Sequence, residues 1–198
     1  MEERISKWLP LLKRDNCYCT KADEDICLEE PNSEGYARIT ITHKNPCIVI
    51  KNMDKNCFPL LSHQKCCDHL LIEEKQSSYV LHIIEMKKTL TMRMWNPKMV
   101  PQFQGGWQHA LLVAGILHIP NFSDIHCYTA SRRIIELDPE TSTNPTLFRQ
   151  QVGLPSSPRC IDDAKKVPLC SIIPNCYASH KVIKLTEDNG FGVLSLDN

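Results

Sequence analysis

Two apolar runs of the sequence, 68–74 and 79–87, carry acidic and basic residues in matching places: Asp68 opens the first run, and Glu85 and Lys87 close the second. Apolar runs of this length separated by a short polar stretch predict a β-hairpin. If the four residues between the runs form the turn, antiparallel partners have residue numbers that sum to 153, which places Asp68 opposite Glu85. Because side chains alternate along a strand with a period of two, Asp68, Glu85 and Lys87 are expected on one face.

This arrangement suits a divalent cation. Two facing carboxylates, about 5 Å apart at their Cβ atoms, repel each other unless a cation or a proton lies between them. Mg²⁺ takes one or two protein carboxylates, keeps several waters and completes its shell with phosphate oxygens of a substrate. The Lys87 amine would orient or deprotonate the attacking water and balance the charge that develops on the phosphate. The pattern therefore predicts a metal-dependent phosphodiesterase with Asp68 and Glu85 as metal ligands.

The same residues resemble a known nuclease signature. Asp68, sixteen intervening residues and then Glu85-Met86-Lys87 at the end of an apolar strand resemble the D…(D/E)xK motif of the restriction-endonuclease-like, or PD-(D/E)xK, superfamily, over roughly residues 25–120. The resemblance implies an α/β (α+β) fold, in which a mixed central sheet contains the motif hairpin and is flanked by helices. It also implies an endonuclease that uses Mg²⁺ or Mn²⁺ to cut DNA or RNA, as in bacterial antiviral defence. The chain departs from the pattern because Cys67 stands where the family has proline.

A helix after the motif strand is part of this resemblance, and in the superfamily it often carries a Gln or Lys that faces the site. Here the segment 105–117 is expected to be that helix, and it supplies Gln108 as the fourth catalytic residue. The alternatives for that role are Gln102 and Gln104. An upstream acid of the family corresponds to Glu29 or Glu30, and no motif chooses between them.

A non-catalytic interpretation accounts for the same residues. Carboxylates and lysines at strand ends are commonly solvated edge residues, and in that case the chain is a nuclease-like scaffold or a protein-interaction module. Eleven cysteines offer such a module structural zinc, since thiolates and imidazoles are the ligands that Zn²⁺ prefers. The candidate clusters are Cys17 and Cys19 with Cys27, His63 with Cys66 and Cys67, and Cys170 and Cys176 with His180. None has paired C-x₂-C spacing, so packed reduced thiols are favoured over zinc.

Composition and charge limit the kinds of partner that the chain is expected to bind. The 198 residues suit one domain with a substantial core, and 23 basic residues balance 23 acidic ones. A chain without net charge lacks the footprint of a strong non-specific nucleic-acid binder. A nuclease of this composition is therefore expected to gather basic side chains on one face, or to depend on a protein partner or on homo-oligomerisation. The basic candidates are Lys87, Lys88, Arg93, Lys98, Arg132 and Arg133.

Localisation follows from the absence of targeting signals in the sequence. The N-terminus is charged and has no apolar core of a signal peptide, and no window reaches the ~18 apolar residues of a membrane span. The expectation is a cytoplasmic protein with reduced cysteines and no membrane partner.

The remaining sequence predicts the elements around the hairpin. Helical spacing of apolar residues predicts an amphipathic helix in 1–14, and the acidic segment 23–30 before Pro31 predicts a helical turn. Alternation and β-branched residues predict that 36–42 and 47–51 are strands of the same sheet. Further strands are expected at 125–129, 133–137, 181–186 and 193–196.

The C-terminal third of the chain has a different composition. The segment 138–158 is rich in Pro, Ser, Thr, Asn and Gln, which predicts a loop or a partly disordered stretch. The expected division is a nuclease-like core with an N-terminal helix in 1–137 and a loop-rich extension in 138–198 that packs on the core.

Overall fold

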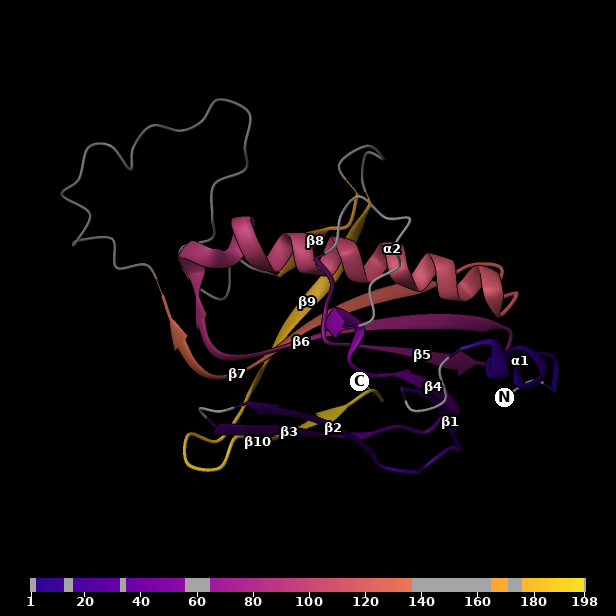
Figure 1. The fold of residues 1–198 in the computed structure, drawn as a ribbon, viewed down its shortest axis with the longest axis horizontal. Coiled ribbons are helices and arrows are strands. Elements are labelled where there is room, and N and C mark those ends of the chain that lie inside the picture. The colour runs from indigo at the N-terminus through magenta and orange to yellow at the C-terminus, as the bar shows by residue number, and fades with distance from the viewer. Residues whose placement is uncertain are drawn as a thin grey trace.

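A seven-stranded sheet is the centre of the molecule, with helix α2 on one face and a three-stranded sheet on the other (Figure 1). The computed structural model describes residues 3–12, 16–32, 35–55, 65–136, 165–170 and 176–197. Its elements are α1 Glu3–Trp8, η1 Leu9–Leu11, β1 Cys17–Thr20, β2 Ile26–Asn32, β3 Gly35–Thr42, β4 Cys47–Ile50, η2 Met53–Lys55, β5 His69–Lys75, β6 Ser78–Thr91, η3 Met92–Met94, η4 Trp95–Met99, α2 Val100–Ile116, β7 Asp124–Ile135, β8 Lys166–Pro168, β9 Tyr177–Lys184 and β10 Phe191–Ser195. The predicted mixed α/β fold is confirmed.

The large sheet has the strand order β1-β4-β5-β6-β7-β9-β8 and the small sheet the order β10-β3-β2. In the large sheet, pairing is antiparallel from β1 to β6, parallel from β6 through β7 to β9, and antiparallel between β9 and β8. The connection from β6 to its parallel neighbour β7 contains α2, as parallel strands require a crossover. In consequence, the motif strand β6 lies in the middle of the sheet and is paired on both sides.

The hairpin register is the one that the sequence predicts. In β5 and β6, His69 pairs with Ile84 and Leu70 with Ile83, and both pairs sum to 153. Gln76 in the turn has a φ of 50°, the left-handed conformation that two-residue hairpin loops use. With this register, the position before β5 that holds Asp68 lies opposite Glu85.

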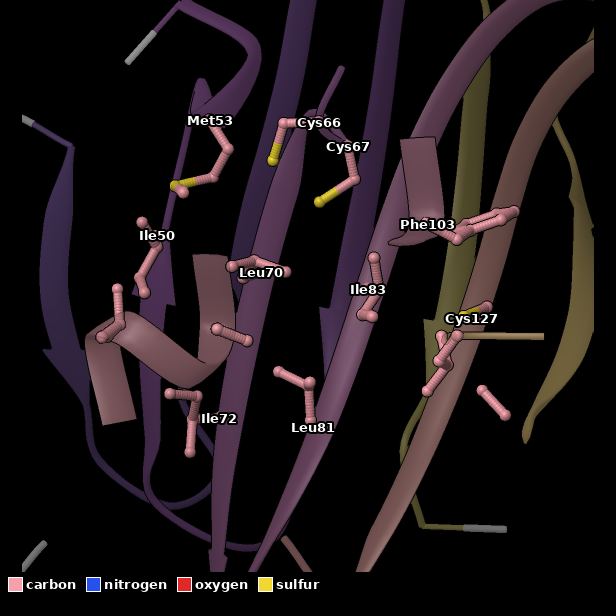
Figure 2. Close-up of a cluster of buried hydrophobic side chains, with 14 of the residues drawn as sticks. Ile50, Met53, Cys66, Cys67, Leu70, Ile72, Leu81, Ile83, Phe103 and Cys127 are labelled. Atoms are coloured by element: carbon pink, nitrogen blue, oxygen red, sulfur yellow. The ribbon is translucent and has the colours of Figure 1, made fainter. Parts of the chain in front are cut away.

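Alternation along the hairpin divides its apolar side chains between two cores. Leu70 and Ile83 belong to the core on the α2 side of the sheet, which also includes Phe103 of that helix; Figure 2 labels these side chains. Leu71 and Ile84 point the other way and join a second core with the small sheet. Burial of both faces anchors the register, because a slip of one residue would exchange the two cores.

Two glycines let α2 approach the sheet closely. A Cβ atom at Gly105 would overlap the carbonyl oxygen of Lys65, and one at Gly106 would lie 2.7 Å from the Cys67 sulfur and 2.8 Å from Ile83. The predicted helix 105–117 begins earlier than expected, at Val100, because Pro101 stands in its first turn, where proline is tolerated. The glycines are therefore inside the helix and set its distance from the motif strands.

Several sequence-based expectations are corrected. The segment 23–30 is not a helical turn but leads into β2, since Ile26 and Leu28 are buried with a period of two. The strand 36–42 forms as β3, yet it lies in the small sheet, whereas 47–51 forms β4 of the large one. The two strands expected at 125–129 and 133–137 are one continuous strand, β7.

The C-terminal residues contribute to both sheets. β8 and β9 extend the large sheet, and β10 pairs in parallel with β3 in the small one. The predicted strands 181–186 and 193–196 correspond to β9 and β10. The predicted loop 138–158 lies outside the described residues.

Candidate active site

The hairpin brings the three motif residues together in the interior. Asp68 is 6 % exposed and Glu85 0 %, while the side chain of Lys87 is about one-third exposed. The Asp68 Oδ2 atom accepts a hydrogen bond of 2.6 Å from the backbone N–H of Met86, the residue between the other two. The solvated-edge interpretation therefore fails for the carboxylates, which are buried.

The Glu85 carboxylate uses its two oxygens differently. Its Oε1 atom forms an ion pair with the Lys87 ammonium and accepts a hydrogen bond of 2.5 Å from Gln102 Nε2. Its Oε2 atom is buried and accepts no hydrogen bond from the described part of the chain. A buried carboxylate oxygen without a donor is costly, so it is available to a cation or to a proton.

The helix residue that reaches the site is Gln102, one of the alternatives to Gln108. Gln102 lies in the first turn of α2, which begins five residues before the expected start. Gln108 is six residues further along, about 9 Å of helical rise and on a different side of the helix. Gln104, the other alternative, donates a hydrogen bond of 3.1 Å to the carbonyl oxygen of Pro168. The assignment of the supporting glutamine is therefore corrected to Gln102.

Burial and repulsion from neighbouring carboxylates make both groups weak acids. Burial, with the negative charge of Glu30 as the next cause, raises the pKa of Asp68 to about 7. Burial and the charge of Asp68 raise the pKa of Glu85 well above its ordinary value. Burial alone would lower the pKa of Lys87, but Glu85 and Asp68 outweigh it and the net shift is upward. Close to neutral pH the pair thus holds a proton unless another cation replaces it.

Glu30 is the upstream acid whose charge acts on this site. It lies on β2 of the small sheet, on the side of Ile26 and Leu28, and its carboxylate raises the pKa of Asp68, Glu85 and Lys87. Glu29 points to the other face of β2, where it lies 3.8 Å from the Arg38 guanidinium and is largely exposed. The charge around the motif residues therefore comes from both sheets.

A cavity of ≈ 470 Å³ adjoins the motif residues. Its lining is Asp54, Lys65, Cys66, Lys87, Thr89, Leu90, Thr91, Met94, Lys98, Met99 and Gln102. Lys87 and Gln102, the two residues that contact Glu85, belong to this lining. A molecule in the cavity would consequently lie beside the Glu85 carboxylate.

The expected basic face is only partly present. Of the six candidates, Lys87 and Lys98 line the cavity. Arg132 instead lies against the turn of the small sheet, where a Cβ atom at Gly190 would contact its guanidinium. Arg93 and Arg133 are exposed elsewhere along the chain.

The cysteine clusters do not assemble a zinc site among the described residues. No group of three or more His, Cys, Asp or Glu side chains there is placed to hold a metal ion, and the nine described cysteines are free thiols. His180 packs its ring against Trp95 at 4.6 Å and exchanges a hydrogen bond of 2.9 Å with Thr129. Burial raises the pKa of Cys17 and Cys47 to about 12, as expected for packed, protonated thiols. His63 lies outside the described residues.

Mg²⁺ places smaller demands on the protein than zinc does. It needs only one or two carboxylates, provided that waters and phosphate oxygens complete its shell. The donor set fits this requirement: Asp68 and Glu85 offer carboxylate oxygens, and Glu85 Oε2 lacks a donor in the described structure. The residues that would hold the ion are therefore Asp68 and Glu85.

One reactive group was not anticipated from the sequence. Hydrogen bonds with Cys67 and His109 outweigh burial and lower the pKa of the Cys66 thiol to about 6. His109 is held by a hydrogen bond of 2.8 Å between its Nδ1 and the Gly105 carbonyl oxygen. Residues 66 and 109 are far apart in sequence, so only the packing of α2 reveals that they meet.

Comparisons with known proteins leave the site as the sole basis for a functional assignment. No family model matches the chain, and neither the curated proteins nor the solved structures yield a match. In the described residues, no helix combines the length and the apolar composition needed to cross a bilayer. A function for this chain must accordingly be argued from Asp68, Glu85, Lys87 and their surroundings.

Proposed function

We propose that the protein is a metal-dependent nuclease of the restriction-endonuclease-like type, which hydrolyses phosphodiester bonds in DNA or RNA. The observation that carries the proposal is the pair of buried carboxylates, Asp68 and Glu85, beside Lys87 on adjacent motif strands. Burial of two neighbouring carboxylates destabilises the fold, and a destabilising arrangement of charges is characteristic of functional sites.

Each residue has a role that follows from its contacts. Asp68 and Glu85 hold Mg²⁺ or Mn²⁺, which supplies Lewis-acid activation of the phosphate and of the attacking water. Gln102 orients the Glu85 carboxylate through its hydrogen bond to Oε1. When substrate binds, the Lys87 ammonium shifts from Glu85 towards the phosphate, where it balances the negative charge of the transition state.

A non-catalytic scaffold is the second candidate, and a specific observation favours it. The Lys87 ammonium already neutralises Glu85, and Asp68 already accepts a hydrogen bond from Met86, so both charges have internal partners. In a scaffold these contacts would only tie β5 to β6. The two candidate functions predict different effects when Asp68 or Glu85 is replaced by its amide. A nuclease would lose its cleavage activity, whereas a scaffold would still bind its partner.

The test is a cleavage assay on labelled double-stranded DNA, single-stranded DNA and RNA with Mg²⁺, Mn²⁺ or EDTA. The wild-type protein is expected to cut only with metal, and Glu85→Gln, Asp68→Asn and Lys87→Ala each to lower the rate by at least about 100-fold, the range found when a group that stabilises transition-state charge is removed. Cutting that persists in EDTA, or that survives Glu85→Gln, would exclude the proposed chemistry.

Matched control variants come from the same hairpin. Glu74→Gln removes a carboxylate at the far end of β5, and Lys88→Ala removes the exposed lysine next to Lys87 that does not line the cavity. Both are expected to retain the wild-type cleavage rate within about twofold, because neither residue lines the cavity and Glu74 lies at the opposite end of β5 from Asp68. Since a composition without net charge is consistent with partner dependence, the assay is repeated over protein concentration and with cell extract.

A further inference from the structure

The cavity next to Glu85 has two kinds of lining. Leu90 and Met99 are almost completely buried and, with the half-buried Met94, form an apolar part. Lys87 and Lys98 bring ammonium groups to the same space. A ligand that fits both parts has a flat or compact apolar body and an anionic group.

A nucleotide has this composition. Its base offers a flat polarizable surface, which thioether and aliphatic side chains accommodate, and its phosphate pairs with ammonium groups. The cavity volume of ≈ 470 Å³ lies within the range of about 300–1,000 Å³ that is typical of small-molecule sites. The cavity therefore matches one nucleotide with its phosphate near Lys87, beside the Glu85 carboxylate.

We infer that this cavity holds one unpaired nucleotide of the substrate, so that the nuclease acts on single-stranded nucleic acid; the inference rests on the proposed function. Bases in a duplex are stacked and paired, and a pocket lined by side chains can receive one only from a single strand or after it has been flipped out at a cost of a few kcal/mol. Binding of single strands relies on stacking surfaces and a few cations rather than on a strongly basic face. This agrees with a chain in which basic and acidic residues balance.

The lining also sets a limit on which end of the nucleotide meets the metal ligands. Asp54 adds a carboxylate to the cavity, whereas Lys87 contacts Glu85 directly. The phosphate is accordingly placed at the Lys87 side, and the base over Met94 and Leu90. In this orientation the nucleotide that fills the cavity is the one directly attached to the scissile phosphate.

Binding is tested without cleavage, with Glu85→Gln protein in EDTA and a fluorescent single-stranded oligonucleotide, compared with the same sequence as a blunt duplex. The single strand is expected to bind at least about tenfold more tightly, and dTMP to compete with it. Thr89→Trp, which fills the cavity, is expected to weaken binding about tenfold or more, in line with the loss of one stacked base. Lys98→Ala is expected to weaken it roughly threefold to tenfold and to reduce the salt dependence by about 0.7 of a unit in the log–log slope.

Lys88→Ala is the matched control for Lys98→Ala, since it removes an exposed lysine outside the cavity lining, and its binding is expected to equal that of the parent protein. Circular dichroism and melting temperature confirm that Thr89→Trp is folded; if it is not, Lys98→Ala with its control decides. Equal binding of duplex and single strand, or binding unaffected by Lys98→Ala, overturns the inference.

The two proposals fail separately. Metal-dependent cutting that Thr89→Trp and Lys98→Ala leave unchanged would refute the nucleotide site and keep the nuclease. Single-strand binding that depends on Thr89 and Lys98, in a wild-type protein that cuts no substrate, would support the nucleotide site and refute the nuclease.

Discussion

Asp68→Asn is expected to remove the pH dependence of stability that comes from an acid whose pKa burial and a neighbouring charge raise. The pKa of Asp68 is about 7 in the folded protein, against 3.8 for the ordinary side chain. A carboxyl whose folded pKa is raised contributes stability at pH values below its unfolded pKa, and this contribution is lost as the pH rises through the folded value. Between pH 5 and pH 8 these two values give a loss of about 2–3 kcal/mol in the free energy of unfolding.

Asparagine carries no charge, and its Oδ1 atom can still accept the hydrogen bond that Met86 donates to Asp68. The variant is therefore expected to fold, and to lose about 2–3 kcal/mol less than the wild type between pH 5 and pH 8. For a chain of this length the difference corresponds to roughly 5–10 °C in melting temperature. Thermal and urea unfolding with a thiol reductant, at half-unit pH steps, measure it. Parallel pH profiles for the two proteins would refute the raised pKa of Asp68, and with it the charge strain on which the proposed function relies.

Three other expectations follow from the same contacts. Because Asp68 and Glu85 hold a proton near neutral pH, binding of Mg²⁺ or Mn²⁺ should release protons and strengthen as the pH rises from 5.5 to 8. Calorimetry in buffers of different ionisation enthalpy measures the proton release. A metal affinity that is independent of pH would contradict this expectation. Gly105→Ala should destabilise the fold by about 2–4 kcal/mol, because its methyl group meets the Lys65 carbonyl. Gly115→Ala has open space around its methyl group and should stabilise α2 by about 0.5–1 kcal/mol. Urea denaturation compares the two variants, and equal effects would argue against the close contact of α2 with Lys65. Iodoacetamide should alkylate Cys66 with a rate that rises through a pKa of about 6, unlike Cys17, and mass spectrometry of digests reports which thiol reacts. Uniform labelling of both thiols would show that Cys67 and His109 do not lower the pKa of Cys66.

The local sequence pattern was sufficient to predict the register of the hairpin, but not to predict which strands belong to which of the two sheets. The pairing of Leu70 with Ile83 followed from the turn alone, because a hairpin is a local structure with its register set by loop length. The placement of strand 36–42 in a second sheet did not follow, since alternation says that one face is buried without saying which surface buries it. The acidic residues of 23–30 and the Pro31 that follows predict a helical turn, whereas the alternate burial of Ile26 and Leu28 becomes evident only in the sheet.

The site shows the same division between local and distant information. Asp68, Glu85 and Lys87 are brought together by one hairpin, so the sequence could predict their common face. The choice of Gln102 over Gln108 depends on where α2 begins, and helix boundaries are among the least certain features of a sequence. The contribution of Glu30 and the pair Cys66 and His109 arise from packing between layers, which no spacing in the chain encodes.

The delivery of Glu30 by the small sheet has a consequence for the order in which the site matures. The hairpin can form as soon as residues 68–87 leave the ribosome, whereas β10, which completes the small sheet beside β3, follows every described strand of the large sheet in the chain. Until that sheet docks, Leu71 and Ile84 lack the core that covers their face. Glu30 would likewise be away from Asp68 until then, so the part of the rise in the Asp68 pKa that Glu30 causes would appear only once both sheets have assembled. The acidity of Asp68 would in this way report whether the two sheets have come together.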